Sequence, residues 1–127
     1  MTIKQMKVKE IMTKNVITTT KDKTAYHIAK LMEKHNIGSV IIANKDKIEG
    51  IITEKDLVRK VIALNICPSN IKAKDIMTTN LITGVPDQTV AEVNRILNLN
   101  NIRRLPIIED GRLVGIVTTT DLIRQVY

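Results

Sequence analysis

The first half of the chain contains two kinds of apolar pattern. Val40–Ala43 and Ile48–Ile52 are nearly continuous apolar runs, which predict strands at residues 38–43 and 47–53 that are buried on both faces. The polar residues between them, 44–46, predict a turn. After this hairpin, apolar residues recur at helical spacing as far as about residue 65. The pattern therefore predicts two adjoining strands that run directly into a helix.

The residues before this hairpin predict one more strand and one more helix. Residues 15–18 are typical of a short strand, and a helix is expected from about Asp22. The residues predicted to share the buried face of this helix are Ala25, Ile28, Ala29 and Met32. The predicted order is thus strand, helix, strand, strand, helix.

The same pattern occurs again 65 residues later in the chain. An ungapped shift aligns residues 8–62 with residues 73–127 and gives 19 identical positions. Two copies are too few for a solenoid, so the repeat predicts one globular module with pseudo-twofold symmetry. The predicted fold class is α/β (α+β), built from two β-α-β-β-α repeats.

Three segments follow from this repeat. Residues 1–66 are the first repeat with an N-terminal arm, residues 67–72 are a linker, and residues 73–127 are the second repeat. The arm has apolar residues at near-helical spacing among lysines, so we expect it to pack against the first repeat or against a partner subunit. The linker can span at most about 25 Å, so the repeats are expected to lie side by side.

Each repeat carries the motif Gly-x-x-Thr-x-x-Asp where a predicted strand turns into a helix, at Gly50–Asp56 and at Gly115–Asp121. One interpretation is a variant of the capping box, in which the Thr and Asp side chains bond free backbone N–H groups. The other interpretation is a ligand site, because a carboxylate in this place can accept hydrogen bonds from a pair of sugar hydroxyls and the free N–H groups suit a phosphate.

Two further motifs accompany these stretches. Ile-Met-Thr opens each repeat, at residues 11–13 and 76–78, and Asn-Ile-Arg-Arg-Leu-Pro-Ile-Ile occupies residues 101–108. In their order and spacing these motifs resemble the tandem cystathionine-beta-synthase (CBS) domains of a Bateman module, over nearly all of the chain. The resemblance implies a non-catalytic regulatory sensor with two clefts between its repeats. The clefts would hold an adenosine-containing ligand, AMP, ADP, ATP or S-adenosylmethionine, and the module would signal to a regulated partner.

The resemblance also implies roles for individual residues. Asp56 and Asp121 would accept hydrogen bonds from ribose hydroxyls, while Thr53 and Thr118 would bond phosphate or ribose oxygens. Further contacts would come from the backbone near the first strand and at the start of the second strand. The residues at these places are Ile17, Thr18, Ile37, Gly38, Ser39, Ile82, Thr83, Ile102, Arg103 and Arg104.

The two repeats differ within these motifs. The second has Arg103-Arg104 where the first has Gly38-Ser39, and guanidinium groups suit phosphate oxygens. We therefore expect unequal clefts, the second repeat's arginines favouring a phosphorylated ligand, unless this pair is ordinary solvated charge. The first repeat also has Ile41 in place of the proline that the family carries there, which leaves its loop geometry open.

The charge of the chain offers an alternative function. Its net charge is +7, and residues 1–72 carry all of it while residues 73–127 are neutral. A basic first repeat could bind nucleic acid. Against this, the chain has few aromatic side chains that could stack on bases, because it contains two Tyr and no Phe or Trp.

The two helices that follow the motifs carry more apolar residues than a single packing face requires. These residues either form a homodimer interface or cover their own sheets. They are Leu57, Val58, Val61, Ile62, Leu64, Leu122, Ile123 and Val126.

Catalysis and metal binding are not indicated. His27 and His35 lie eight residues apart on a lysine-bearing helix, and Cys67 has no paired cysteine. No apolar run approaches the roughly 18 residues of a membrane span. A single cysteine and the lack of a secretory signal fit the cytoplasm. We expect no enzyme activity, no metal, no resident cofactor and no membrane association.

Overall fold

The computed structural model describes residues 2–126, without the side chains of Lys4 and Val126. The chain forms two compact units. The central unit is Ile17–Leu81, and the terminal unit combines the residues up to Val16 with those from Ile82 onward. The mixed α/β class predicted from the sequence is confirmed.

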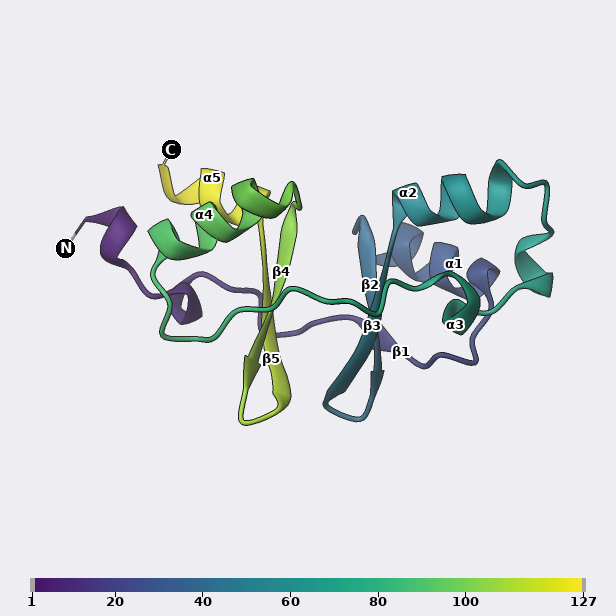
Figure 1. Cartoon of the computed structure of the whole chain (residues 1–127), viewed down its shortest axis with the longest axis horizontal. Coiled ribbons are helices and arrows are strands. Elements are labelled where there is room, and N and C mark those ends of the chain that lie inside the picture. The colour runs from purple at the N-terminus through teal and green to yellow at the C-terminus, as the bar shows by residue number, and fades with distance from the viewer. Residues whose placement is uncertain (1, 127) are drawn as a thin grey trace. The chain divides into compact units, whose positions relative to one another are not determined.

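The central unit is a three-stranded sheet with helices (Figure 1). Strand β1 pairs with β2 in parallel, and β2 pairs with β3 in antiparallel. In chain order its elements are β1 (Thr18–Thr19), α1 (Ala25–His35), β2 (Ser39–Asn44), β3 (Lys47–Thr53), α2 (Glu54–Leu57), a π-helical segment (Val58–Ile62), a 3-10 turn (Pro68–Asn70) and α3 (Ala73–Ile76).

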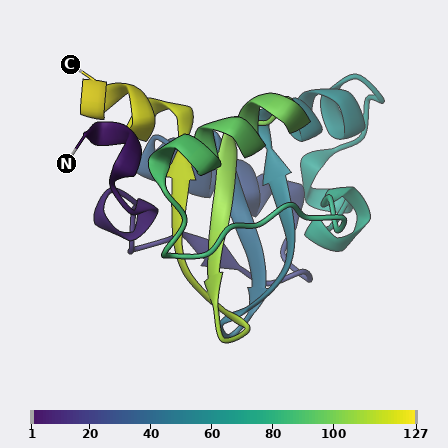
Figure 2. The ribbon, with the colours of Figure 1, turned by 60° about the vertical axis from the view of Figure 1, so that its left-hand side comes forward.

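The terminal unit repeats this plan with a two-stranded antiparallel sheet. Its elements are two 3-10 turns (Ile3–Gln5 and Val8–Glu10), α4 (Val90–Asn100), β4 (Arg104–Glu109), β5 (Arg112–Thr118) and α5 (Thr119–Val126). Figure 2 shows the N-terminal turns beside α4 and α5.

Pro106 explains why the second sheet is smaller. In the central unit the backbone N–H of Ile41 donates to the carbonyl of Ile17, at 3.4 Å, and this bond helps to attach β1. The equivalent residue in the second repeat is Pro106, which has no N–H to donate. The counterpart of β1 is therefore reduced to a single bridge between Gly84 and Ile107.

Each unit has its own core. In α1, the predicted core residues Ala25, Ile28 and Met32 are buried and Ala29 is half-buried. In α4, Val90, Val93 and Leu97 are buried, while Asn94 is exposed. The central core is completed by Val40, Ile42, Ile52, Val61, Ala73 and Ile76, and the terminal core by Val8, Leu105, Ile107, Val117 and Leu122. The helical periodicity thus predicted the buried stripes.

The helix predicted from about Asp22 begins at Ala25. Thr24 is its N-cap, and its hydroxyl accepts a 3.2 Å hydrogen bond from the N–H of His27. Thr89 caps α4 in the same way, accepting from Glu92 at 3.1 Å. Asn36 and Asn101 end the two helices in left-handed backbone conformation, with φ of 52° at both.

The opening segment of each repeat packs against the other repeat's second hairpin strand. Thr13 bridges Ile116 of β5, and Thr78 bridges Ile51 of β3. Beside these bridges, Met12 covers Gly115 and Met77 covers Gly50, so closely that a Cβ on either glycine would lie 2.5 Å or 2.7 Å from the methionine sulfur. The two motifs that define the repeat, Ile-Met-Thr and Gly-x-x-Thr-x-x-Asp, are therefore in contact.

The N-terminal arm consequently packs within the terminal unit, and its predicted packing against the first repeat is wrong. The N–H of Val8 donates to the carbonyl of Gln88 at 2.8 Å, and the N–H of Val90 donates to Met6 at 2.8 Å. Val8 is fully buried in the terminal core. The compact units therefore cross the boundaries of the sequence repeats, because each contains an opening segment that belongs to the other repeat.

Two surface ion pairs follow the same reciprocal pattern. Lys9 contacts Asp87 at 3.0 Å, and the equivalent Lys74 contacts Asp22 at 3.8 Å. The hydrogen bond between Lys9 and Asp87, with their opposite charges, raises the pKa of Lys9 and lowers the pKa of Asp87. All four side chains remain largely exposed, so these pairs contribute little to stability.

Candidate functional site

In the first repeat, Thr53 and Asp56 form the reciprocal cap that the motif predicts. The backbone N–H of Thr53 donates to Asp56 Oδ2 at 2.9 Å, and the N–H of Asp56 donates to Thr53 Oγ1 at 3.3 Å. The Thr53 hydroxyl also donates to Asp56 Oδ2 at 3.2 Å. The capping interpretation is therefore correct for this pair. The cap uses one of the two carboxylate oxygens, Oδ2.

The second repeat has the same cap. The N–H of Thr118 donates to Asp121 Oδ2 at 2.9 Å, and the N–H of Asp121 donates to Thr118 Oγ1 at 3.2 Å. Within the described part of the chain, Oδ1 of Asp121 has neither a hydrogen bond nor an ion pair. A capping carboxylate can therefore retain an oxygen that is able to accept bonds from a ligand.

The fold brings the start of the second strand next to this cap in both repeats. Ser39 pairs with Thr53, and the N–H of Glu54 donates to the carbonyl of Gly38 at 3.1 Å. In the second repeat Arg104 pairs with Thr118, and the N–H of Thr119 donates to the carbonyl of Arg103 at 2.9 Å. Ile37 and Ile102 are the half-buried residues immediately before these segments.

The first-strand residues lie one strand further away. Thr18 pairs with Ile41 on β2, on the side opposite to β3, and it is exposed, whereas Ile17 is half-buried. In the terminal unit Ile82 and Thr83 precede the bridge residue Gly84 and are both exposed, Ile82 by 38 %. The candidate residues therefore form two separate sets, one in each unit. Each set occupies a sheet and the helix start that follows it.

The two sets differ in charge. Arg103 is exposed and Arg104 is half-buried, while Gly38 and Ser39 hold the same places in the first repeat. The first repeat has a cation elsewhere, because Lys60 Nζ lies 3.2 Å from Asp56 Oδ1. Sequence reasoning missed Lys60, although its spacing of four residues from Asp56 in a predicted helix was a signal for an ion pair.

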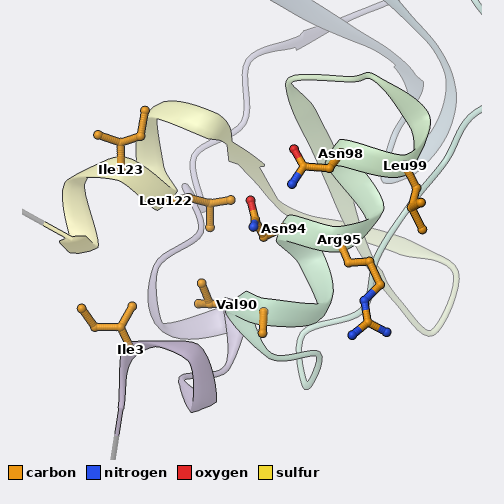
Figure 3. Close-up of a pocket in the computed structure, with 9 residues that line it drawn as sticks. Ile3, Val90, Asn94, Arg95, Asn98, Leu99, Leu122 and Ile123 are labelled. Carbon is orange, nitrogen blue, oxygen red and sulfur yellow. The ribbon is translucent and has the colours of Figure 1, made fainter.

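A second feature was also missed. An apolar hollow of about 580 Å³ lies on the terminal unit between α4, α5 and the first 3-10 turn (Figure 3). Its lining residues are Ile3, Val90, Ala91, Asn94, Arg95, Asn98, Leu99, Leu122 and Ile123, of which Leu99 is 77 % exposed. None of these lining residues belongs to the predicted ligand set, although Leu122 directly follows Asp121.

The predicted apolar surplus on the helices is partly exposed. Val58, Ile62, Leu64 and Ile123 are each more than half exposed, whereas Val61 and Leu122 are buried and Leu57 is half-buried. The side chain of Val126 lies outside the described residues. These helices therefore cover their own sheets with part of the stripe and present the rest to the surface.

Residues 2–126 contain no group of three His, Cys, Asp or Glu side chains that could hold a metal ion. His27 Nε2 lies 3.3 Å from the Thr19 hydroxyl, and Cys67 is exposed. Among the described helices, none is both long and apolar enough to span a bilayer.

Comparison with known proteins shows the family of both repeats. The family described as CBS domain matches residues 8–63 and 73–127. An uncharacterized protein from Methanopyrus kandleri is 43 % identical over 124 residues, covering 96 % of this chain and 63 % of that protein. The chain thus spans less than two thirds of that relative.

Two solved structures share the fold. An uncharacterized conserved protein from Pyrococcus horikoshii has a TM-score of 0.89 and 31 % identity, over 99 % of this chain and 95 % of its own. The CBS domain pair of protein MJ0100, solved in complex with 5'-methylthioadenosine and S-adenosyl-L-methionine, has a TM-score of 0.86 and 35 % identity, over 95 % of each chain. From these matches together, the chain belongs to the CBS domain family and contains two CBS domains.

Proposed function

We propose that this protein is a non-catalytic regulatory module that binds an adenosine-containing ligand and passes its occupancy to a partner. The observation that carries the proposal is the Asp121 carboxylate, whose Oδ2 is fixed by its helix cap while its Oδ1 is available. The similar MJ0100 domain pair, crystallised with two adenosyl compounds, supports the choice of ligand class.

The cap would prepare Asp121 for a ribose. Since the N–H of Thr118 holds Oδ2 at 2.9 Å, the carboxylate is oriented before the ligand arrives, and little side-chain freedom is lost on binding. Its Oδ1 can accept hydrogen bonds from the two adjacent ribose hydroxyls. The Thr118 hydroxyl, which already accepts from the N–H of Asp121, still has a proton to donate to a ligand oxygen.

The second repeat also has the groups that a phosphorylated ligand needs. Arg103 is exposed immediately before β4, and its carbonyl accepts a hydrogen bond from the N–H of Thr119, which fixes the backbone beside Thr118. A guanidinium group can bond a phosphate through two parallel N–H groups. We propose that Arg103 and Arg104 favour AMP, ADP or ATP, and that exposed Ile82 packs against the base.

Regulation would follow from linkage. A bound ligand can shift only an equilibrium between states for which its affinity differs, so its effect requires two arrangements of the module or of its oligomer. We propose a homodimer that forms through exposed apolar residues of the helices, Val58, Ile62 and Ile123, and through Leu64 in the turn after Ile62. Sedimentation equilibrium tests this point, and a monomer at all concentrations and ligand states would remove the dimer from the proposal.

Isothermal titration with AMP, ADP, ATP and S-adenosylmethionine tests the ligand proposal. We expect at least one of them to bind, and Asp121→Ala to weaken the tightest ligand by about tenfold or more, the range for losing hydrogen bonds to a charged group. Asp121→Asn is the matched control, because its amide oxygen can keep the cap while its charge is lost. No heat with any of the four ligands would contradict the proposal.

The nucleic-acid alternative loses part of its basis in the folded chain. The central unit has eleven Lys and Arg against seven Asp and Glu, a net charge of +4, and the terminal unit has nine against six, a net charge of +3. The net charges of the two units are similar because the lysine-bearing arm packs in the terminal unit. A gel shift that fades steeply with rising salt would nevertheless establish binding to a nucleic-acid backbone.

A further inference from the structure

Lys60 makes two contacts that tie it to the candidate site of the first repeat. Its Nζ lies 3.2 Å from Asp56 Oδ1 and donates a 2.8 Å hydrogen bond to the backbone carbonyl of Ile76. Ile76 is the last residue of α3, so this carbonyl belongs to a helix C-terminus, where a cation is favoured. The ammonium group is therefore held in place by two acceptors from different elements.

The contact with Asp56 uses the carboxylate oxygen that the cap leaves available, Oδ1. Asp56 Oδ2 accepts from the N–H and the hydroxyl of Thr53, and Oδ1 contacts Lys60, so both oxygens have partners. The Asp56 side chain is only 15 % exposed, whereas that of Lys60 is 43 % exposed. A ligand that approaches Asp56 therefore meets a carboxylate that is already neutralised and largely enclosed.

The second repeat lacks this arrangement. The residue equivalent to Lys60 is Gln125, which carries no charge, and Asp121 has no ion pair among the residues that the structure describes. The helices differ as well, since Lys60 lies in the middle of the π-helical segment Val58–Ile62 while α5 is a regular α-helix. Local π-helical turns often occur at functional positions.

We infer that Lys60 is a specificity-determining residue that makes the two ligand sites unequal. Its ammonium group contacts Asp56 Oδ1, and a ribose must compete with it before both hydroxyls can bond that oxygen. This inference rests on the proposed function, because it concerns how adenosine-containing ligands distribute between the two repeats. It assigns the tighter site to Asp121 and the weaker site to Asp56.

The size of the effect follows from the ion pair. A partly exposed pair is weakly stabilising, so its displacement should lower affinity by about two- to tenfold and should not abolish binding. The bond to the Ile76 carbonyl holds Lys60 near Asp56 and places the effect towards the upper part of this range.

A reciprocal exchange of the two equivalent residues provides the test. Lys60→Gln gives the first repeat the residue of the second, and Gln125→Lys gives the second repeat the residue of the first. In a regular helix a lysine at position 125 lies four residues from Asp121, within reach of its carboxylate. Each variant is titrated as the full chain with AMP, ATP and S-adenosylmethionine, and its thermal unfolding is measured to confirm that it folds.

Site assignment uses two further variants. Asp121→Ala should weaken the tighter binding event of the wild-type protein by about tenfold or more, and Asp56→Ala should weaken the other event. We expect Lys60→Gln to tighten the weaker event by about two- to tenfold, and Gln125→Lys to weaken the tighter event by a similar factor.

The outcomes separate this inference from the proposed function. If the wild-type protein binds a ligand but Lys60→Gln leaves the weaker event unchanged, Lys60 does not determine specificity and the inference is wrong. Weaker ATP binding in Lys60→Gln would also overturn it, because the ammonium would then assist a phosphate. If neither the wild-type protein nor any folded variant binds an adenosine-containing ligand, both the inference and the proposed function fail.

Discussion

The Thr-x-x-Asp motif shows that capping and ligand binding are compatible roles for the same residues. In each repeat the cap uses Oδ2 of the aspartate, which is a bond that the helix start needs. The difference between the repeats lies in the other oxygen, which Lys60 contacts at Asp56. Replacing the cap residues therefore affects folding and binding together, whereas replacing Lys60 or Gln125 addresses binding more selectively.

The glycine of each motif is a position where a single methyl group should be costly. A Cβ on Gly115 would lie 2.5 Å from the Met12 sulfur and 3.1 Å from the Thr13 carbonyl oxygen. Gly115→Ala should therefore destabilise the protein by about 1–3 kcal/mol, the range for overpacking a core. Urea denaturation monitored by circular dichroism measures this loss.

A double variant separates the two contacts of Gly115. Met12 can move or be shortened, whereas the Thr13 carbonyl belongs to the backbone bridge with Ile116. We expect Met12→Ala with Gly115→Ala to cost less than the sum of the single changes, because the methyl group then fills space that the thioether leaves. Full additivity would show that Met12 does not pack on this glycine.

At the scale of elements, the helix starts depend on single hydroxyl groups. Thr89 accepts a 3.1 Å hydrogen bond from the N–H of Glu92 and begins α4, whose buried face forms much of the terminal core. Thr89→Ala should lower the free energy of unfolding by about 1 kcal/mol, as is typical for the loss of an N-cap. Thermal or urea unfolding measures the change.

The matched control is Thr79→Ala, since Thr79 is an exposed threonine outside the helices. It should change stability by less than about 0.5 kcal/mol, as most surface substitutions do. Equal losses in the two variants would show that the Thr89 cap is not a specific contribution.

Most elements could be predicted from the sequence, because their apolar pattern is local. The strands predicted at 38–43 and 47–53 are β2 at Ser39–Asn44 and β3 at Lys47–Thr53. The least accurate boundaries are those of short elements. The strand expected at residues 15–18 is shorter and lies at Thr18–Thr19, because only these two residues pair with β2. The helix after β3 was expected to reach about Asn65, but it widens into a π-helix that ends at Ile62.

At the scale of the whole molecule, the sequence revealed the repeat but not how its segments are shared. Val8 pairs with Gln88 and Thr13 with Ile116, contacts between residues 80 or more positions apart. No local pattern reveals such long-range partners, which is why the arm was expected on the first repeat or on a partner subunit. The charge of the chain was likewise counted over halves of the sequence. The folded units have similar net charges, because the lysine-rich arm packs in the terminal unit.

In the candidate site, the repeated motifs could be recognised from the sequence, whereas the contacts between separate segments could not. Its motif residues, Thr53 with Asp56 and Thr118 with Asp121, are recognisable because both copies keep the same spacing. Lys60 was not recognised, because one lysine on a lysine-rich helix is indistinguishable from solvated charge until its contacts with Asp56 and Ile76 are known. The hollow between α4 and α5 likewise depends on the packing of three separate segments.

A crystal structure of the full chain grown with the tightest-binding of AMP, ADP, ATP and S-adenosylmethionine tests the role of Asp121 most directly. We expect the ligand in the second repeat, with its ribose hydroxyls within hydrogen-bonding distance of Asp121 Oδ1 and its base near Ile82. A ligand bound elsewhere, with Asp121 making only its cap to Thr118, would contradict it.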